Sequence, residues 1–366
     1  MLRSAAPYDE SGPTMSDVPG VECAGLTRWL ARAHPDLAEG DLEATVIAGG
    51  RSNLTYRIDG ARVPLVLRRP PLGHVLTTAH DMRREHRVIS ALEGSPVPVP
   101  PTIDVVDDTE HGEVTGTVFI VMEHVAGEVL RRPDQNAAYQ PAGLHALGIS
   151  LAQILTDLHA IDPGDVGLAD FGRPDGYLAR QLTTWRRQYE ASRSRRQPTL
   201  DALQQALEAD VPEQSGRTGI VHGDFRLDNV IVAGTAASPR VSAVLDWEMA
   251  TLGDPLVDLG MLGLYWEIGG IIDDSALAPS AVTPGAGYPE FAELVDTYSA
   301  RAGVATPDLS WYRAFAAYKL AVILEGIHFR YQAGETVGEG FDRIGDLVTP
   351  LAADGLQHQS RHARKS

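Results

Sequence analysis

Asp224, Asn229 and Asp246 have the residue types and the spacing for chemistry on a phosphate. The first two lie in the polar loop of I-V-H-G-D-F-R-L-D-N-V-I-V, and the third follows in V-L-D-W-E. Apolar runs of strand type flank the loop. Carboxylate and amide oxygens suit Mg²⁺, which keeps much of its water and binds through carboxylates and substrate phosphates. The pattern can therefore place one base and two metal ligands around a single phosphate, as phosphoryl transfer requires.

The order H-G-D-x-x-x-x-N, L-D-W-E and G-D-P-x-x-D-L resembles the aminoglycoside phosphotransferase and choline kinase-like family. The resemblance covers most of the chain and implies an α+β, two-lobed protein-kinase-like fold. In that fold a small N-lobe carries an antiparallel sheet, and a larger C-lobe is mainly helical. The resemblance also implies that Asp224 is the catalytic base and that Asn229 and Asp246 hold Mg²⁺.

The residues around the catalytic loop are expected to support it. Gly223 takes the place of an Arg that pairs with an activation-loop phosphate in protein kinases, so we expect no control of that kind. His222 is expected to be a buried structural residue; the alternative is a second base. Asp254 and Asp258 are expected to cap the next helix and to hold the loop.

A glycine turn between two segments of strand type, 42–48 and 54–58, supplies candidates for nucleotide binding. Glycine has no side chain, so backbone N–H groups can approach phosphates closely. The turn alone is weak support because hairpins use the same residues. Beside the later loop it favours ATP binding through Gly49, Gly50, Arg51, Ser52 and Asn53.

The next strand is expected to carry the cation that binds the α and β phosphates. The resemblance points to Lys there, but the sequence has Arg68, with Arg69 as the alternative. Glu85 lies on the predicted helix 80–93 and is expected to pair with Arg68; otherwise it is a solvated carboxylate. A match to the family's hinge in F-I-V-M-E-H-V-A-G-E implies that the backbone of Glu123 and Val125 binds adenine. Backbone recognition leaves ATP and GTP both open.

The predicted organisation follows from these matches. We expect a flexible lead over residues 1–20, an N-lobe over 21–122, a hinge over 123–127, a C-lobe over 128–352 and a flexible tail over 353–366. We do not expect the lead to act as a secretion signal, because it lacks the basic start and the apolar core of one.

Two segments of the expected C-lobe are candidates for acceptor selection. The run G-Y-L-A-R-Q-L-T-T-W-R-R-Q-Y resembles the branch of the family that is joined in some proteins to an acyl-CoA dehydrogenase, which implies a hydroxyacyl-CoA or hydroxy-acid acceptor. Local basic charge suits such a substrate, although a solvated helix face anchored by a Trp is as good an interpretation. The basic residues are Arg180, Arg186, Arg187, Arg193, Arg195 and Arg196. The second segment is a predicted helix in which the resemblance implies residues of the acceptor pocket at Tyr318, Glu325, Phe329 and Arg330. The alternative is that these residues only pack in the core.

Composition limits the partners. With 49 acidic and 31 basic residues the formal charge is −18, which argues against nucleic acid or an anionic membrane. The same charge would suit a cationic aminoglycoside or amino alcohol, or simply serve solubility. A single cysteine, Cys23, rules out an internal disulfide and fits a cytoplasmic location.

The sequence therefore predicts an enzyme that transfers the γ-phosphate of ATP to a hydroxyl of a small molecule. A non-catalytic nucleotide-binding protein is the alternative from another class. The acceptor and the oligomeric state stay open.

Overall fold

The computed structural model describes residues 17–48, 53–72, 81–213, 217–272, 274, 277–305, 308–334 and 341–362. The chain divides into two compact units. The first comprises Met1–His86 and Thr102–His124, and the second comprises Arg87–Pro101 and Val125–Ser366. The predicted α+β class is confirmed, because the first unit is built on an antiparallel sheet and the second is mainly helical.

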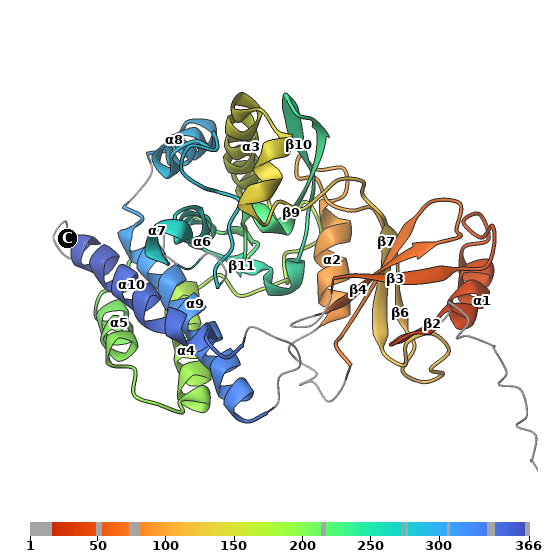
Figure 1. Cartoon of the computed structure of the whole chain (residues 1–366), viewed down its shortest axis with the longest axis horizontal. Coiled ribbons are helices and arrows are strands. Elements are labelled where there is room, and N and C mark those ends of the chain that lie inside the picture. The colour runs from red at the N-terminus through yellow and green to blue at the C-terminus, as the bar shows by residue number, and fades with distance from the viewer. Residues whose placement is uncertain are drawn as a thin grey trace, which may run out of the picture. The chain divides into compact units, whose positions relative to one another are not determined.

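The first unit contains a five-stranded antiparallel sheet in the order β3-β4-β5-β7-β6, drawn in red to orange in Figure 1. The strands are β3 (Glu43–Ala48), β4 (Leu54–Asp59), β5 (Leu65–Arg69), β6 (Thr102–Asp107) and β7 (Val118–Glu123). A short hairpin, β1 (Asp17–Val18) and β2 (Val21–Glu22), precedes α1 (Cys23–Ala33).

Alternation along the strands gives this sheet two packed faces. Tyr56 and Leu67 point to one face, where they share a core with Leu26 and Leu30 of α1. Val66 belongs to a second cluster with residues of β7 and with Met82 of α2 (Met82–Leu92). Because side chains alternate along a strand with a period of two, the strand L-V-L-R-R can supply both faces.

The chain passes from the first unit to the second between His124 and Val125, within the expected hinge 123–127, but a further boundary was not expected. This further boundary passes through α2 and places residues 87–101 with the second unit. Val88, Leu92 and Val97 accordingly belong to the large core of that unit. The apolar stripe of α2 therefore serves two cores, which a boundary drawn from the sequence did not anticipate.

The second unit contains eight α-helices among the described residues (Figure 1). They are α3 (Pro141–Ala160), α4 (Tyr177–Ser192), α5 (Pro198–Ala209), α6 (Leu256–Trp266), α7 (Ile268–Ile271), α8 (Phe291–Ala302), α9 (Ser310–Gln332) and α10 (Val348–His362). Two antiparallel ribbons accompany them, β8 (Gly219–Val221) with β11 (Thr251–Gly253) and β9 (Val230–Thr235) with β10 (Ser238–Val244).

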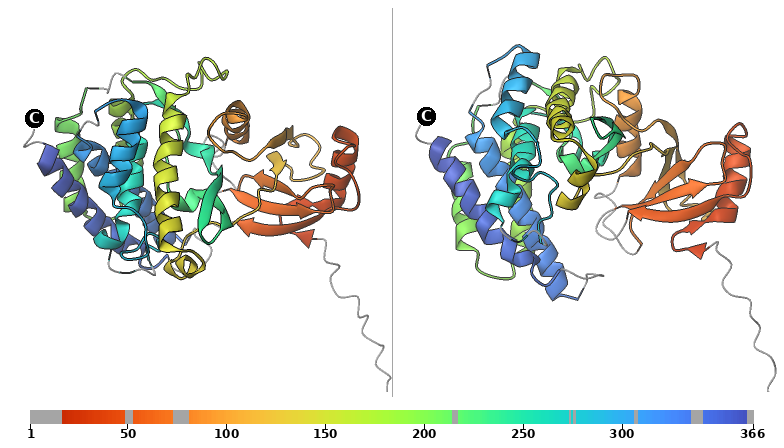
Figure 2. Two further views of the ribbon diagram at one scale, coloured as in Figure 1. Left: turned by 90° about the horizontal axis from the view of Figure 1, so that it is seen from above. Right: turned by 45° about the horizontal axis from the view of Figure 1, so that its top comes forward.

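Helix α9 is the central element of this helical region. It packs against α4, α5, α6 and α10, and Figure 2 shows α9 and α10 side by side from further directions. Residues 310–322 of α9 are buried on every side. A helix surrounded in this way carries apolar residues all round rather than on one stripe.

The expected flexible tail over 353–366 is wrong for residues 353–362, which continue α10. Val348, Leu351, Ala352 and Gly355 are buried at positions i, i+3, i+4 and i+7, so the helix has an apolar face for its neighbours. Residues 17–20, expected in a flexible lead, belong to the β1–β2 hairpin. Among the described helices, none combines the length and the apolar character needed to cross a bilayer.

Candidate active site

Two strand ends bring Asn229 and Asp246 into neighbouring positions. Strands β9 and β10 are antiparallel, with Val230 opposite Val244. The N–H of Leu245 donates to the carbonyl oxygen of Asn229 at 2.8 Å, which extends the pairing by one residue. Asp246 follows directly. Pairing within one hairpin thus brings together two residues that are separated in the sequence by both of its strands.

Asp224 and Asn229 are in direct contact. Nδ2 of Asn229 donates to the Asp224 carbonyl oxygen and to its Oδ2, both at 2.9 Å. Because both bonds use the amide nitrogen, Oδ1 is the atom of Asn229 that remains for a cation. Asn229 is buried, whereas the Asp224 side chain is 20% exposed and can be reached by a substrate.

Asp246 has a backbone φ of +66° and is the only residue other than glycine with a positive φ in the described part of the chain. Aspartate tolerates this left-handed conformation better than most residues. With Oδ1 of Asn229, its carboxylate offers the hard oxygens that Mg²⁺ prefers. The described residues contain no group of three or more His, Cys, Asp or Glu placed to hold a metal ion. A site of this composition fits Mg²⁺, which takes few protein ligands and completes its shell with phosphate and water.

Gly223 is required by the path of the loop. Its φ is +86°, and a Cβ atom there would lie 2.8 Å from the backbone oxygen of Met249. No other residue type fits without a shift of the backbone. The departure from the protein-kinase motif at this position therefore has a local steric cause.

His222 is fully buried and uses both ring nitrogens within the loop. Its Nδ1 accepts the Asp224 N–H at 3.2 Å, so Nε2 carries the proton that is donated to the Leu245 carbonyl at 2.9 Å. The ring also packs on Trp247, with the centroids 4.6 Å apart. The structural role predicted for His222 is confirmed, because neither nitrogen is available as a base.

Asp258 of α6 holds the backbone of the catalytic loop, as predicted. Its carboxylate accepts the backbone N–H groups of His222 at 2.7 Å and Gly223 at 2.8 Å. Complete burial alone would raise the pKa of Asp258, but hydrogen bonds from His159 and His222 hold it below its usual value. Asp254 also has its predicted role, since it accepts the N–H of Leu256 at the start of α6.

His159, at the end of α3, is part of this support. Its Nε2 lies 3.2 Å from Oδ2 of Asp258, and its Nδ1 lies 2.9 Å from the hydroxyl of Tyr298 on α8. Two helices from distant parts of the sequence are thereby connected to the loop. Sequence reasoning missed this link, since a His near the end of an apolar helix gives no signal of its partners.

Arg226 is a cation of the loop that the sequence argument did not single out. Its Nε lies 3.2 Å from Oδ2 of Asp224, and its Nη1 lies 3.1 Å from Oδ2 of Asp228. The guanidinium also lies 4.4 Å from the ring centroid of Tyr265. Burial raises the pKa of Asp228, and the charge of Arg226 opposes that shift. Arg226 thus holds one oxygen of Asp224 in place.

Lys319 of α9 is a second missed cation. Its Nζ donates to the carbonyl oxygen of Gly223 at 2.6 Å and lies 5.3 Å from the ring centroid of Trp185 on α4. The residue is 6% exposed. Burial lowers the pKa of Lys319, and the negative charge of Asp224 acts against that shift. A lysine within a helix that reads as core gave no sign of this position.

In the first unit, the structure brings Arg68 and Glu85 together. Nε of Arg68 lies 2.9 Å from Oε1 of Glu85, whose side chain is 2% exposed. Nδ2 of Asn53 lies 3.5 Å from the other carboxylate oxygen. The alternative cation, Arg69, donates instead to the backbone oxygens of Gly20 and Thr115 and has a structural role. Gly49, Gly50, Arg51 and Ser52 lie outside the described residues.

The two predicted hinge residues differ in their backbone bonding. Glu123 ends β7 opposite Leu65. For Val125, in the second unit, no backbone hydrogen bond is formed with any described residue. Its N–H and C=O are therefore available to a ligand as far as the described chain is concerned.

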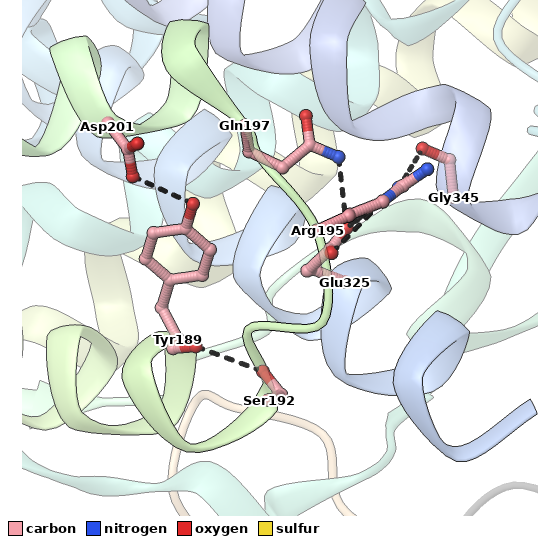
Figure 3. A network of polar contacts seen from close by, with 7 residues as sticks. All are labelled: Tyr189, Ser192, Arg195, Gln197, Asp201, Glu325 and Gly345. Carbon is pink, nitrogen blue, oxygen red and sulfur yellow. Dashed lines mark hydrogen bonds and ion pairs between the residues drawn. The ribbon is translucent and has the colours of Figure 1, made fainter. Parts of the chain in front are cut away.

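The basic segment after α4 is a network of internal bonds (Figure 3). Arg195 makes a two-pronged ion pair with Glu325, at 2.8 Å from Nη2, and also donates to the Gly345 carbonyl. Gln197 donates to the same carboxylate, and Tyr189 donates to Asp201. Two of the four residues predicted to line the acceptor pocket are core residues. Glu325 is fully buried in this network, and Tyr318 is buried with its hydroxyl hydrogen-bonded to Gln204. Phe329 is 38% exposed.

Other arginines of the segment are also engaged. Arg186 pairs with Glu190 and Glu208, Arg193 with Asp201, and Arg180 with two backbone carbonyls. The ring of Trp185 is buried against the core. These contacts agree with the interpretation of the segment as an anchored helix face.

An Asp and an Asn in contact on a strand–loop–strand segment, with a second Asp after the next strand, match what is expected of a small-molecule phosphotransferase of protein-kinase-like fold. Residues 43–313 match the model of the phosphotransferase enzyme family, and the chain belongs to that family. A solved structure of a proposed aminoglycoside phosphotransferase from Ralstonia eutropha is 30% identical, with a TM-score of 0.77 over 93% of this chain and 99% of that one.

Two further comparisons place the chain among its relatives. Acyl-CoA dehydrogenase family member 11 of Gallus gallus is 34% identical over 92% of this chain. The match takes in only 43% of the relative, so the chain spans less than half of its length. A thermostable mutant of aminoglycoside phosphotransferase APH(4)-Ia, solved with AMP-PNP and hygromycin B, has a TM-score of 0.58 at 14% identity over 93% of this chain and 99% of that one, a likeness of fold.

Proposed function

We propose that the protein transfers the γ-phosphate of ATP to a hydroxyl of a small molecule. The observation that carries the proposal is the bonded pair of Asp224 and Asn229 next to the strand end that bears Asp246. One carboxylate is exposed to a substrate, while the amide oxygen of Asn229 and the carboxylate of Asp246 are oxygen ligands of the kind that Mg²⁺ takes. This division of roles is the one that phosphoryl transfer needs.

In this proposal the second unit supplies the reacting groups. Asp224 orients the acceptor hydroxyl and accepts its proton, a role that contributes about 10²–10⁴-fold to rate. Asn229 and Asp246 hold Mg²⁺, which when bound neutralises the charge of the transferring phosphate. Arg226 restrains Asp224 through their ion pair.

The first unit is proposed as the nucleotide-binding lobe. Arg68, positioned by Glu85, would bind nucleotide phosphates, together with backbone groups of the turn Gly49–Asn53. The backbone of Glu123 and Val125 would bind adenine in the hinge 123–127. The AMP-PNP complex of the APH(4)-Ia mutant supports a nucleotide at this site, and the unused backbone of Val125 leaves adenine and guanine both open.

For the acceptor we favour a hydroxyacyl-CoA or hydroxy acid. The chicken relative carries the name of an acyl-CoA dehydrogenase and covers the same region, including the run from Gly176 to Tyr189. Two cations next to Asp224, Arg226 and Lys319, also disfavour a cationic acceptor. The second candidate is an aminoglycoside or amino alcohol, which the net charge of −18 and the phosphotransferase structures support.

The test is ADP release with Mg-ATP across aminoglycosides, amino alcohols, hydroxy acids and hydroxyacyl-CoA thioesters, with Asp224→Asn as the matched variant. We expect acceptor-dependent release that falls by about 10²-fold or more in the variant, with Mg-ATP affinity unchanged. Asp246→Ala should instead weaken metal-dependent nucleotide binding. Full activity in Asp224→Asn would refute the assignment, and nucleotide binding without ADP release for any acceptor would favour the non-catalytic alternative.

A further inference from the structure

Lys319 is unusual in this chain because of its residue type. The sequence carries 31 basic residues, and only Lys319 and Lys365 are lysines. Among the described residues Lys319 is therefore the single ammonium group, and it lies inside a buried stretch of α9. An ammonium is compact and offers three donors on a flexible stem, whereas a guanidinium is planar and bulky.

The position of Lys319 is next to the reacting carboxylate. Its Nζ bonds to the carbonyl of Gly223, the residue before Asp224. Consecutive Cα atoms are about 3.8 Å apart, so the ammonium lies beside the backbone of the proposed base. Lys319 is paired with no carboxylate of the described residues, and Gly223 is its only hydrogen-bond acceptor there. Two of its three N–H groups are left for another partner.

Trp185 provides a second, independent observation. Its ring lies under the ammonium at 5.3 Å, and the residue is 94% buried, since 6% is exposed. Its Nε1 has no hydrogen-bond partner among the described residues. Buried indole N–H groups normally have one, because leaving a buried donor unpaired is costly. An ammonium of α9 with spare donors and an unpaired indole N–H of α4 thus belong to two side chains that pack together beside the catalytic loop.

We propose that Lys319 and Trp185 bind an oxygen of the acceptor, a carboxylate or thioester carbonyl close to the hydroxyl that is phosphorylated. Such an oxygen would accept a hydrogen bond from each of the two donors, and a carboxylate would also neutralise the charge of the ammonium. The inference rests on the proposed function and adds to it the residues that determine acceptor class. A quaternary ammonium acceptor offers no oxygen for this subsite and would meet a like charge.

The simplest competing explanation is that Lys319 only holds the Gly223 carbonyl. That role would affect the loop for every acceptor alike. A binding role would affect acceptors that carry the oxygen and leave others unchanged. The two roles therefore differ in which acceptors respond, and in whether KM or kcat changes.

The direct test uses the scarcity of lysine. Protein made with isotope-labelled lysine should give one side-chain Cε signal for each lysine, and Lys365→Arg identifies which one belongs to Lys319. We expect hydroxybutyrate or its CoA thioester to shift the Lys319 signal saturably, and choline to leave it in place. A response to the acid alone identifies a carboxylate, and a response to the thioester alone identifies its carbonyl. No response to either overturns the proposal.

Kinetic variants give a second readout. Lys319→Met should raise KM for the responding acceptor about 10- to 100-fold. Trp185→Phe, which keeps an aromatic ring but removes the N–H, should raise this KM several-fold. Lys319→Arg should give a KM between those of the wild type and Lys319→Met. Equal losses of kcat for all acceptors with unchanged KM would assign Lys319 to the loop alone and refute the subsite.

The proposed function is judged separately. ADP release that requires Asp224 can persist when the Lys319 signal is silent, and then only the subsite fails. A shifted Lys319 signal without ADP release from any acceptor would leave a binding site and refute the kinase. Where Lys319→Met does not fold, the wild-type signals and Trp185→Phe still decide.

Discussion

Asp258 and Glu325 are both fully buried carboxylates of the second unit, and their partners differ in kind. Asp258 accepts hydrogen bonds from two backbone N–H groups and from the imidazole of His159. Glu325 accepts a guanidinium and a side-chain amide, from Arg195 and Gln197 (Figure 3). One carboxylate fixes the backbone of the catalytic loop, and the other connects the segment after α4 to α9.

The difference shows why local basic charge was a poor guide to the acceptor. Arg193 and Arg195 lie in the most basic part of the sequence, yet their charges are used in ion pairs within the fold. Of the two cations beside Asp224, Arg226 of the loop is itself ion-paired with Asp224 and Asp228, whereas Lys319 of α9 is paired with no carboxylate of the described residues. A charge is available for binding only where the fold leaves it without an internal partner.

The largest effect is expected from Asp258→Asn. The amide would place a donor against backbone N–H donors, so both loop bonds cannot be kept. We expect unfolding to be easier by about 3 kcal/mol and turnover to fall about 10²-fold through misplacement of Asp224. Denaturant unfolding and ADP release measure the two losses. A destabilised variant with full turnover per folded molecule would show that the loop does not depend on Asp258.

Arg195→Met should affect stability alone. Glu325 would remain buried without its charge partner, and we expect a loss of about 2 kcal/mol, reduced from the fully buried case because the Arg195 side chain is 33% exposed. Turnover per folded molecule should not change.

The control is the double variant Arg195→Met with Glu325→Met, which removes both charges and should recover most of the stability. If turnover falls in the single variant in step with stability measured under the same conditions, the contrast between the two carboxylates is lost.

Much of the catalytic segment could be predicted because its motifs are local. Asp224 and Asn229 are five positions apart, so their contact follows from one loop, and Gly223 reflects a backbone path that excludes other residues. The roles of His222 and Asp258 were also predicted. Motif and structure coincide where the constraint is short in sequence.

What escaped prediction depends on packing between distant segments. His159 reaches Asp258 across 99 positions, and Lys319 reaches Gly223 across 96. No periodicity reports such contacts, because residues 310–322 of α9 are buried on every side, polar ones such as Lys319 included. Helix α10 was missed for a related reason: its charged end suggested disorder while its first turns carried the buried face.

Mild acid should destabilise the surroundings of His358 on α10 before it affects the catalytic loop held by Asp258. Burial, with the charges of Arg313 and Arg361, lowers the pKa of His358 on α10 to about 4 from 6.5. The unfolded chain then binds the proton first, so stability from neutral His358 is complete above about pH 6.5 and is lost as pH falls toward 4. The pKa of Asp258 is below its usual value, so the stability that its ionised carboxylate contributes is lost only under more acidic conditions.

The measurement is the urea midpoint as a function of pH for the wild type and His358→Gln. The variant should show a smaller decline between pH 6.5 and 4, while the decline below that range, to which Asp258 contributes, should persist. Identical curves for the two proteins would mean that His358 is accessible to protons in the folded state.

The smallest effect is expected from Arg193→Gln. Arg193 pairs with Asp201 at 2.6 Å, but the two side chains are 46% and 30% exposed, and Asp201 keeps its bond from Tyr189. Exposed pairs typically contribute only about 0.2–1 kcal/mol. KM for hydroxy acids and for CoA thioesters should stay within about twofold of the wild type, since a twofold change corresponds to about 0.4 kcal/mol. If Arg193→Gln weakens binding of the thioester and spares the free acid, the basic segment binds the phosphates of CoA, and the Arg193–Asp201 ion pair opens when the acceptor binds.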